Sequence, residues 1–288
     1  MDNLTRVLAA TDGSEHGLRA VVTGAEYASR SGASLDVVSI IETRIFPLGI
    51  EPAQYHDSLA EEYHQAATKQ IAAAGGSEVP VHVRSGLAAP LITQVAEELG
   101  TDLLIVGAHP RPAVARILVG STAERVLRLA RCPVLVATEP RHEPFSRILA
   151  AIDLSAQSRR VLQTAAKLAQ IDRAGFRALY VQDRLTPMLL EAALFDEKES
   201  RHHARSQFSK TLADVSLPSE LMMSREIREG HPGHEILHEA ESWKADLIVM
   251  GSHGFGFFNR LLLGSISLYV LRHGHTSVVV VPRSEGEA

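Results

Sequence analysis

The chain carries near its start the run Val-Leu-Ala-Ala-Thr-Asp-Gly-Ser (residues 7–14), which returns 141 positions later as Ile-Leu-Ala-Ala-Ile-Asp-Leu-Ser (residues 148–155). Each copy is a short apolar run followed by an acidic turn, a pattern typical of a buried strand that ends in a loop. Self-similarity over such a distance indicates a repeated structural unit. The pair therefore predicts that the chain contains two copies of one fold.

Three further blocks repeat in the same order along the chain. Thr-Asp-Leu-Leu-Ile-Val-Gly at residues 101–107 returns as Ala-Asp-Leu-Ile-Val-Met-Gly at residues 245–251, an offset of 144. The pairs Gly120-Ser121 and Gly264-Ser265, and the runs 133–136 and 277–280, stand at the same offset. We therefore predict one domain over residues 1–140 and a second over residues 145–284, with a proline-containing linker between them.

Within each half, short and nearly continuous apolar runs alternate with helical patterns. Such runs are typical of strands buried on both faces of a parallel sheet, with crossover helices between them. The predicted strands are residues 7–10, 34–41, 79–84, 102–106 and 134–137 in the first half, and 148–152, 176–181, 222–227, 247–250 and 278–281 in the second. We expect two α/β domains, each a doubly wound five-stranded parallel sheet whose ligand site lies beyond the carboxyl ends of the strands.

The composition excludes several classes of protein. Of the 288 residues 45% are hydrophobic, without an 18-residue apolar run or a secretory leader pattern, so we expect a cytoplasmic protein with no membrane segment. The net charge of −5, from 29 basic and 34 acidic residues, offers no basic surface for nucleic acid. The lone Cys132 cannot form an internal disulfide and fits a small buried side chain.

A glycine pattern follows the fourth predicted strand of the second half. Gly251-Ser252-His253-Gly254 is followed, after nine residues, by Gly264-Ser265 and a helical pattern through Leu271. Gly251 and Gly254 allow positive φ and let main-chain N–H groups approach phosphate oxygens. A helix that opens at Gly264-Ser265 adds free N–H groups, a favourable dipole and a serine hydroxyl. The joint spacing therefore predicts a polyphosphate site.

In this pattern the second half resembles the universal stress protein family, whose ATP-binding members carry Gly, two residues, Gly, nine residues, Gly, and then Ser or Thr. The resemblance extends once over each half and implies a stress-response role. It implies ATP as the ligand, with ADP or AMP as alternatives and Mg²⁺ as a companion of ATP.

The resemblance also assigns positions around the nucleotide. Asp153 would lie by the adenosine, and the backbone of Val181 would pair with the adenine edge. Met250 would line the base pocket, and Ile266 would add a main-chain N–H beside Ser265. The alternative for Asp153 is a simple carboxylate in the N-cap region of the following helix.

The first half departs from the pattern at one position. It reads Gly107-Ala108-His109-Pro110, then nine residues, then Gly120-Ser121-Thr122, so proline replaces the second glycine. Because proline has a fixed negative φ and no N–H, a loop that needs glycine there cannot keep its conformation. We expect weaker, altered or absent nucleotide binding in this half, although it keeps matching positions at Asp12, Ile40, Gly107, Gly120, Ser121 and Thr122.

The sequence favours a binding protein over an enzyme. No Gly-x-x-x-x-Gly-Lys-Ser/Thr motif is present, and no lysine lies between Gly251 and Ser265. A transferred phosphoryl group would therefore gain little stabilisation. We expect regulation by nucleotide occupancy rather than fast turnover, and no catalytic residues. Two alternatives stay open: a nucleotide-free interaction scaffold, and a slow ATPase or autophosphorylating protein with Ser252 or Ser265 as acceptor.

The chain has 14 histidines, but no metal site is expected. His234 and His238 share a helix face, with His231 nearby, yet no cysteine accompanies them and they align with a loop that enters a helix. We predict a solvated or locally hydrogen-bonded cluster there, and an exposed helix surface at His202-His203. His253, within the glycine pattern, is the histidine expected near the ligand.

The last predicted strands, residues 134–137 and 278–281, are apolar enough to be buried edges. Members of the resembled family pair two domains through these strands. The resemblance therefore implies that the two halves pair within the chain as a pseudo-dimer, with a homodimer of chains as a further arrangement.

Overall fold

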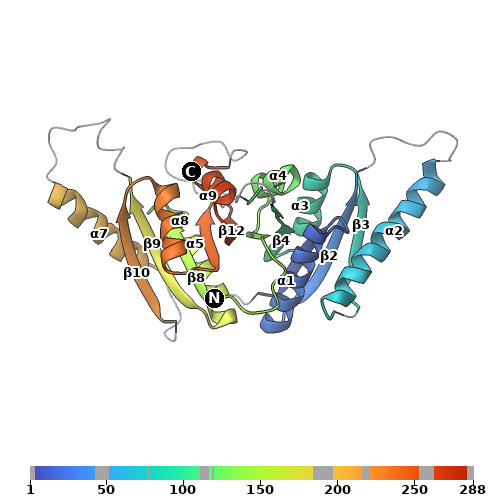
Figure 1. The fold of residues 1–288 in the computed structure, drawn as a ribbon, viewed down its shortest axis with the longest axis horizontal. Coiled ribbons are helices and arrows are strands. Elements are labelled where there is room, and N and C mark those ends of the chain that lie inside the picture. Colours follow the sequence, from blue (N-terminus) through green and yellow to red (C-terminus); the bar gives the residue numbers. More distant parts are fainter. Residues whose placement is uncertain are drawn as a thin grey trace. The chain divides into compact units, whose positions relative to one another are not determined.

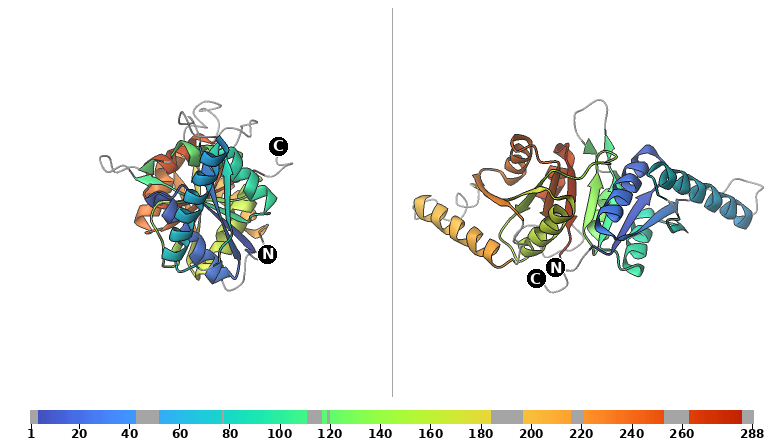
Figure 2. Two further views of the ribbon diagram at one scale, coloured as in Figure 1. Left: turned by 90° about the vertical axis from the view of Figure 1, so that its right-hand side faces the viewer. Right: turned by 90° about the horizontal axis from the view of Figure 1, so that it is seen from below.

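The computed structural model of the protein describes residues 4–42, 52–76, 78–110, 117–118, 120–183, 197–215, 221–252 and 263–283. The chain divides into two compact units, Asp2–Pro144 and Phe145–Ala288. In each unit a five-stranded parallel sheet carries helices on both faces (Figures 1 and 2), which confirms the predicted fold class.

The first unit orders its strands β7-β4-β1-β2-β3, all of them parallel. Helices α1 and α2 pack together over one face of the sheet, and α3 and α4 pack together over the other. The elements are β1 (Arg6–Thr11), α1 (Glu15–Ser31), β2 (Ser34–Ile41), α2 (Pro52–Ala73), β3 (Val81–Ser85), α3 (Ala88–Glu98), β4 (Leu103–Gly107), α4 (Ser121–Leu129) and β7 (Val134–Ala137).

The second unit repeats this plan with the order β10-β9-β8-β11-β12. Here α5 and α7 cover one face of the sheet, and α8 and α9 cover the other. The elements are β8 (Arg147–Ile152), α5 (Ser158–Asp172), β9 (Gly175–Gln182), α7 (Glu197–Ala213), β10 (Met223–Glu229), α8 (Pro232–Ser242), β11 (Leu247–Gly251), α9 (Ser265–His273) and β12 (Ser277–Val281). In Figure 1, α7 and α2 lie beside the outer strands of their own units.

The core of each unit lies between the sheet and its two helical layers. Residues 7–9 of β1 and 148–150 of β8 are fully buried, so these strands are apolar on both faces and show no alternation. Helix α7 packs through Ala204, Phe208 and Leu212, one helical turn apart. The Phe208 ring lies 6.1 Å from that of Tyr180 on β9. The positions between these three residues are exposed or partly exposed, so α7 shows only a weak apolar pattern in the sequence.

The predicted elements agree with the observed ones to within two residues at each end. The first helix has clear local signals at both ends: the Ser14 hydroxyl accepts hydrogen bonds from the first N–H groups of α1, and Gly32, at a φ of 72°, ends the helix. Two short strands were not predicted. His109–Pro110 (β5) and Ile117–Leu118 (β6) form a short antiparallel ladder between β4 and α4.

Two expectations from composition can be compared with the described residues. None of the helices in these ranges is both long and apolar enough to cross a bilayer. Burial raises the pKa of the half-buried Cys132 thiol to about 12. The thiol therefore stays protonated and behaves as the small apolar side chain that the sequence indicates.

Candidate functional site

The second unit brings most of its predicted site residues to one edge of the sheet. Strands β8, β9 and β11 are parallel neighbours or next neighbours, so their carboxyl ends meet at the same edge. The register pairs Met250 with Ala151, and Ile152 with Tyr180. Asp153, which follows β8, therefore lies at the edge where β9 carries Val181 and where Gly251 ends β11. Val181 and Met250 are both buried.

Asp153 has one carboxylate oxygen bonded to protein and one that has no partner. Its Oδ1 accepts hydrogen bonds from the Ser155 N–H at 3.0 Å, the Ser155 hydroxyl at 2.6 Å and the Ser158 hydroxyl at 3.1 Å. Its Oδ2 is buried without a hydrogen bond. The N-cap of α5 is Gln157, so Asp153 does not itself cap this helix, but its bonds to Ser155 and Ser158 place it in the turn that enters α5, as the alternative of a carboxylate in the N-cap region expects. A buried carboxylate oxygen without a protein donor can accept a hydrogen bond from a ligand or from water.

The residue after Asp153 is held in an unfavourable conformation. Leu154 has a φ of 65°, in the region where the equivalent Gly13 of the first unit has a φ of 78°. A side chain costs about 1–2 kcal/mol in that region, whereas glycine costs only its extra freedom in the unfolded chain. We expect Leu154→Gly to stabilise the second unit by about 0.5–1 kcal/mol in urea unfolding, and Gly13→Leu to destabilise the first. A loss of stability in Leu154→Gly would contradict this explanation.

One of the two predicted reasons for Gly251 is wrong, because its φ is not positive. The other, a close approach of main-chain N–H groups to phosphate, stays a prediction. A Cβ on Gly251 would instead lie 2.7 Å from Oε1 of Gln157, at the N-terminus of α5. In the first unit a Cβ on Gly107 would lie 1.9 Å from the His16 carbonyl oxygen of α1. Both glycines let the first helix of the unit pack directly on the end of a central strand.

The predicted opening of the last helix is confirmed. Gly264 is the N-cap of α9, which begins at Ser265, and the first N–H bonded to the preceding turn is that of Leu268. The N–H groups of Ser265 and Ile266 therefore have no acceptor within the helix, as at any helix N-terminus. Ser265 is exposed and Ile266 is partly exposed. His253 and Gly254 lie outside the described residues.

The first unit keeps the acidic turn, and two short strands are described in the segment after β4. Asp12 Oδ1 accepts hydrogen bonds from the N–H of Ser14 at 3.0 Å and from its hydroxyl at 2.5 Å. Gly120 caps α4, so Ser121 and Thr122 begin this helix, and Ile40 is buried in β2. Pro110 pairs with Ile117 in the β5–β6 ladder. The segment that corresponds to the glycine pattern thus contains a strand pair of its own.

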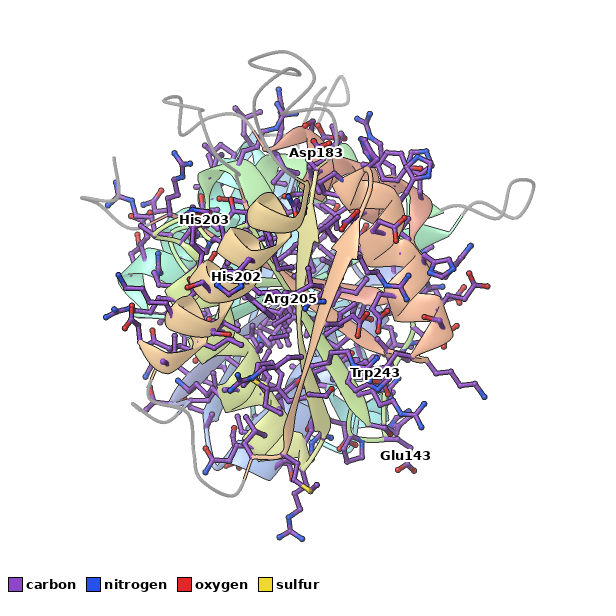
Figure 3. The ribbon with its side chains drawn as sticks, turned by 90° about the vertical axis from the view of Figure 1, so that its left-hand side faces the viewer. Glu143, Asp183, His202, His203, Arg205 and Trp243 are labelled. Atoms are coloured by element: carbon purple, nitrogen blue, oxygen red, sulfur yellow. The ribbon has the colours of Figure 1, made fainter. Side chains whose placement is uncertain are left out.

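Tyr180 belongs to the edge but was missed from the sequence. Burial, and the negative charges of Asp153 and Asp183, raise the pKa of its phenol. The hydroxyl thus lies within the field of both carboxylates, and Asp183 directly follows β9 (Figure 3). The repeat does not point to Tyr180. The equivalent residue of the first unit, which pairs with Thr11, is Ser39. Only the pairing of β8 with β9 places this phenol beside Asp153.

The histidines of α8 form a locally bonded cluster, as predicted. The Tyr269 ring stacks on His273 at 4.1 Å and on His234 at 5.1 Å, and His231 meets it edge-on at 5.6 Å. His238 instead contacts Arg228, which donates a hydrogen bond to its Nδ1 at 2.8 Å. In the ranges that the structure covers, no group of three or more His, Cys, Asp or Glu side chains could hold a metal ion. His202 and His203 are exposed on α7 (Figure 3), as expected.

The fold and this edge define a tandem α/β protein in which two doubly wound units carry equivalent strand-end loops. A family model described as the universal stress protein family matches residues 3–138 and again residues 144–282. The chain therefore belongs to the universal stress protein family.

Individual relatives agree with this assignment. A universal stress protein of Mycobacterium tuberculosis is 27% identical over 96% of this chain and 97% of its own length. One from Methanocaldococcus jannaschii is 30% identical and spans 48% of this chain and 84% of its own. The crystal structure of a universal stress protein from Archaeoglobus fulgidus has the same fold, with a TM-score of 0.74 at 22% identity, over 97% of this chain and 98% of that one.

Proposed function

We propose that the second unit binds ATP, or ADP or AMP in its place, and that the protein acts by nucleotide occupancy rather than by fast turnover. The observation that carries the proposal is the unpartnered, buried Oδ2 of Asp153. A carboxylate can only accept hydrogen bonds, so its partner must be a donor such as a ribose hydroxyl. This agrees with the place beside the adenosine that the family resemblance implies for Asp153.

The phosphates would lie at the other end of the same edge. Gly251, Gly254, Gly264 and Ser265 keep the spacing of the ATP-binding members of the family. The leftover N–H groups at the start of α9 and the dipole of that helix favour an anion there. Ser252, His253 and Ile266 would complete this region, Val181 and Met250 would bound the base, and Mg²⁺ would accompany ATP.

The proposed asymmetry between the units rests on Pro110. Proline donates no N–H, and its segment forms the β5–β6 ladder. We therefore propose that the first unit binds nucleotide weakly or not at all, although Asp12, Gly107, Gly120 and Ser121 keep their positions. Native mass spectrometry of the full chain with ATP should find one nucleotide per chain. Two bound nucleotides would overturn the asymmetric model.

We predict that Asp153→Asn weakens ATP binding about 10- to 100-fold, because hydrogen bonds to a charged group contribute about 1.5–3 kcal/mol. Asp12→Asn, the matched change in the first unit, should leave the affinity unchanged. Isothermal titration of the full chain measures both. Saturating ATP that produces neither heat nor a thermal shift in the unmodified protein would favour a nucleotide-free scaffold. Steady phosphate release would favour a slow ATPase.

We further propose a cytoplasmic regulatory role in stress, with domains at residues 1–140 and 145–284 that pair through β7 and β12. The sequence supports such pairing, because residues 134–137 and 278–281 are all apolar and an apolar last strand needs cover on its free edge. Light scattering of the full chain should find a monomer when the two units pair internally. A dimer would favour pairing between chains.

A further inference from the structure

The carboxylate of Asp153 is held by two serines, one of which has no counterpart in the first unit. The Ser158 hydroxyl donates to Asp153 Oδ1 at 3.1 Å, in addition to the N–H and the hydroxyl of Ser155 at 3.0 Å and 2.6 Å. Three donors on one oxygen fix the direction of the whole carboxylate and occupy Oδ1. The buried Oδ2 is the oxygen that can still accept a hydrogen bond.

Ser158 is itself held in place by packing. It is fully buried at the start of α5, and its N–H donates to the Ser155 carbonyl at 3.0 Å, which closes the turn between them. The neighbouring Gln157 is 3% exposed, and its side-chain amide donates to the Val281 carbonyl at the end of β12 at 2.6 Å. The first turn of α5 is therefore fixed to the sheet, and the Ser158 hydroxyl has a defined position beside Asp153.

The first unit holds its acidic residue with one serine instead of two. Gly17 takes the place of Ser158, at the same offset of 141 that relates Asp12 to Asp153. Among the described residues, Asp12 Oδ1 accepts hydrogen bonds only from the N–H and the hydroxyl of Ser14, and Asp12 is exposed. The carboxylate of the first unit is therefore less constrained than that of the second.

The last residue of the first strand explains this difference. A Cβ on Gly17 would lie 2.1 Å from Oγ1 of Thr11, so no side chain fits at residue 17 while Thr11 keeps its position. The Thr11 hydroxyl is held there, because it donates to Gln70 on α2 at 2.6 Å. The second unit has Ile152 in place of Thr11 and carries Ser158 in place of the glycine. The two units therefore differ by a coupled pair of residues at the acidic turn.

We propose that Ser158 is a positioning residue that directs Asp153 Oδ2 to a ribose hydroxyl, so that the second unit selects ribonucleotides over their deoxy analogues. The nucleotide part of this inference rests on the proposed function. Because the Val181 backbone is expected to take the adenine edge, the ribose hydroxyls are the donors of adenosine left for Asp153. A deoxy sugar would leave Oδ2 buried without a partner, which costs binding energy. Ser158 thus affects the choice of sugar without touching the ligand.

The test compares Ser158→Ala with Ser242→Ala in the full chain. The Ser242 hydroxyl donates to the Glu239 carbonyl on α8 at 3.3 Å, so the control removes a helix hydroxyl elsewhere in the same unit. Hydrogen exchange in the ligand-free protein measures the hold on Asp153, because the Ser155 N–H donates to the same Oδ1. This N–H should exchange about 5-fold faster in Ser158→Ala, and at its original rate in Ser242→Ala. Ser158→Gly, which introduces the residue type of the first unit, should give the same result as Ser158→Ala. Unchanged Ser155 exchange in both Ser158 variants overturns the proposal, whether or not the protein binds ATP.

Titration with ATP and with dideoxy-ATP, which lacks both ribose hydroxyls, measures the consequence. The unmodified protein should bind ATP about 10-fold more tightly, and Ser158→Ala should reduce this preference to about 3-fold or less. A loss of stability alone would not change the preference. Equal binding of both nucleotides by the unmodified protein overturns the ribose contact but not the proposed function. Faster Ser155 exchange with an unchanged preference overturns the positioning role. An unmodified protein that binds neither nucleotide refutes the proposed function, while the Ser155 exchange still decides whether Ser158 holds Asp153.

Discussion

Gly107→Ala is expected to destabilise the first unit by about 3 kcal/mol or more, because the new methyl group would overlap with main-chain atoms. It would lie 1.9 Å from the carbonyl oxygen and 2.6 Å from the carbonyl carbon of His16. Both atoms belong to the main chain in the first turn of α1, so relief requires a shift of that helix on the sheet. Urea unfolding followed by far-ultraviolet circular dichroism measures the loss.

Gly251→Ala is the matched control at the same position of the second unit. There the methyl group would meet Oε1 of Gln157 at 2.7 Å, which belongs to a side chain and can shift at the cost of the hydrogen bond from Gln157 to the Val281 carbonyl. We expect a loss of about 1–2 kcal/mol, and the losses of Gly251→Ala and Gln157→Ala should be less than additive because the two residues share this contact. Trp243, the chain's single tryptophan, lies in the second unit and reports its unfolding by fluorescence. Equal losses at Gly107 and Gly251 would contradict the packing argument.

Glu239→Gln is expected to destabilise the second unit by about 3 kcal/mol, because it leaves two arginines without their shared buried anion. Glu239 on α8 is 2% exposed and accepts from Arg177 on β9 and Arg228 on β10, each at 2.5 Å. Desolvation lowers the pKa of Arg228, but Glu239 and then Glu235 outweigh this effect and raise it. The carboxylate thus joins one helix to two strands.

The Arg177 guanidinium also lies 4.5 Å from the ring of Trp243 (labelled in Figure 3), so tryptophan fluorescence should report the loss of this network directly. Glu235→Gln serves as the control, because Glu235 is partly exposed and lies 3.4 Å from Arg228. Its loss should remain below about 1 kcal/mol. If Glu239→Gln is no worse than Glu235→Gln, Glu239 does not hold α8 to the sheet.

The fold could be predicted because its signals are local and occur twice. Runs such as residues 7–10 and 148–152 are apolar on both faces, which only a covered parallel sheet explains. Caps such as Ser14 and Gly32 mark where a helix begins and ends. The β5–β6 ladder could not be predicted, because a strand pair of two residues on each side has no periodicity to detect.

The candidate site was predictable where it consists of a spaced motif. Gly251 and Gly264 stand out by their spacing, and Asp153 by the family resemblance, while their roles in nucleotide binding stay predictions. The packing of Gly251 against Gln157 could not be predicted, since Gln157 is far away in sequence. Tyr180 carries no motif at all.

The duplicated fold, the expectation of a site at the carboxyl ends of parallel strands, and the family pattern were all present in the order of residues along the chain. Backbone preferences and apolar periodicity act between near neighbours, so one sequence reveals them. The strand order, the unpartnered oxygen of Asp153, the Gln157–Gly251 contact and the hydrogen bond from the Ser267 hydroxyl to the Gly251 carbonyl arise only when distant segments pack. Such contacts depend on ångström-scale distances between helices and strands, which tertiary packing alone sets.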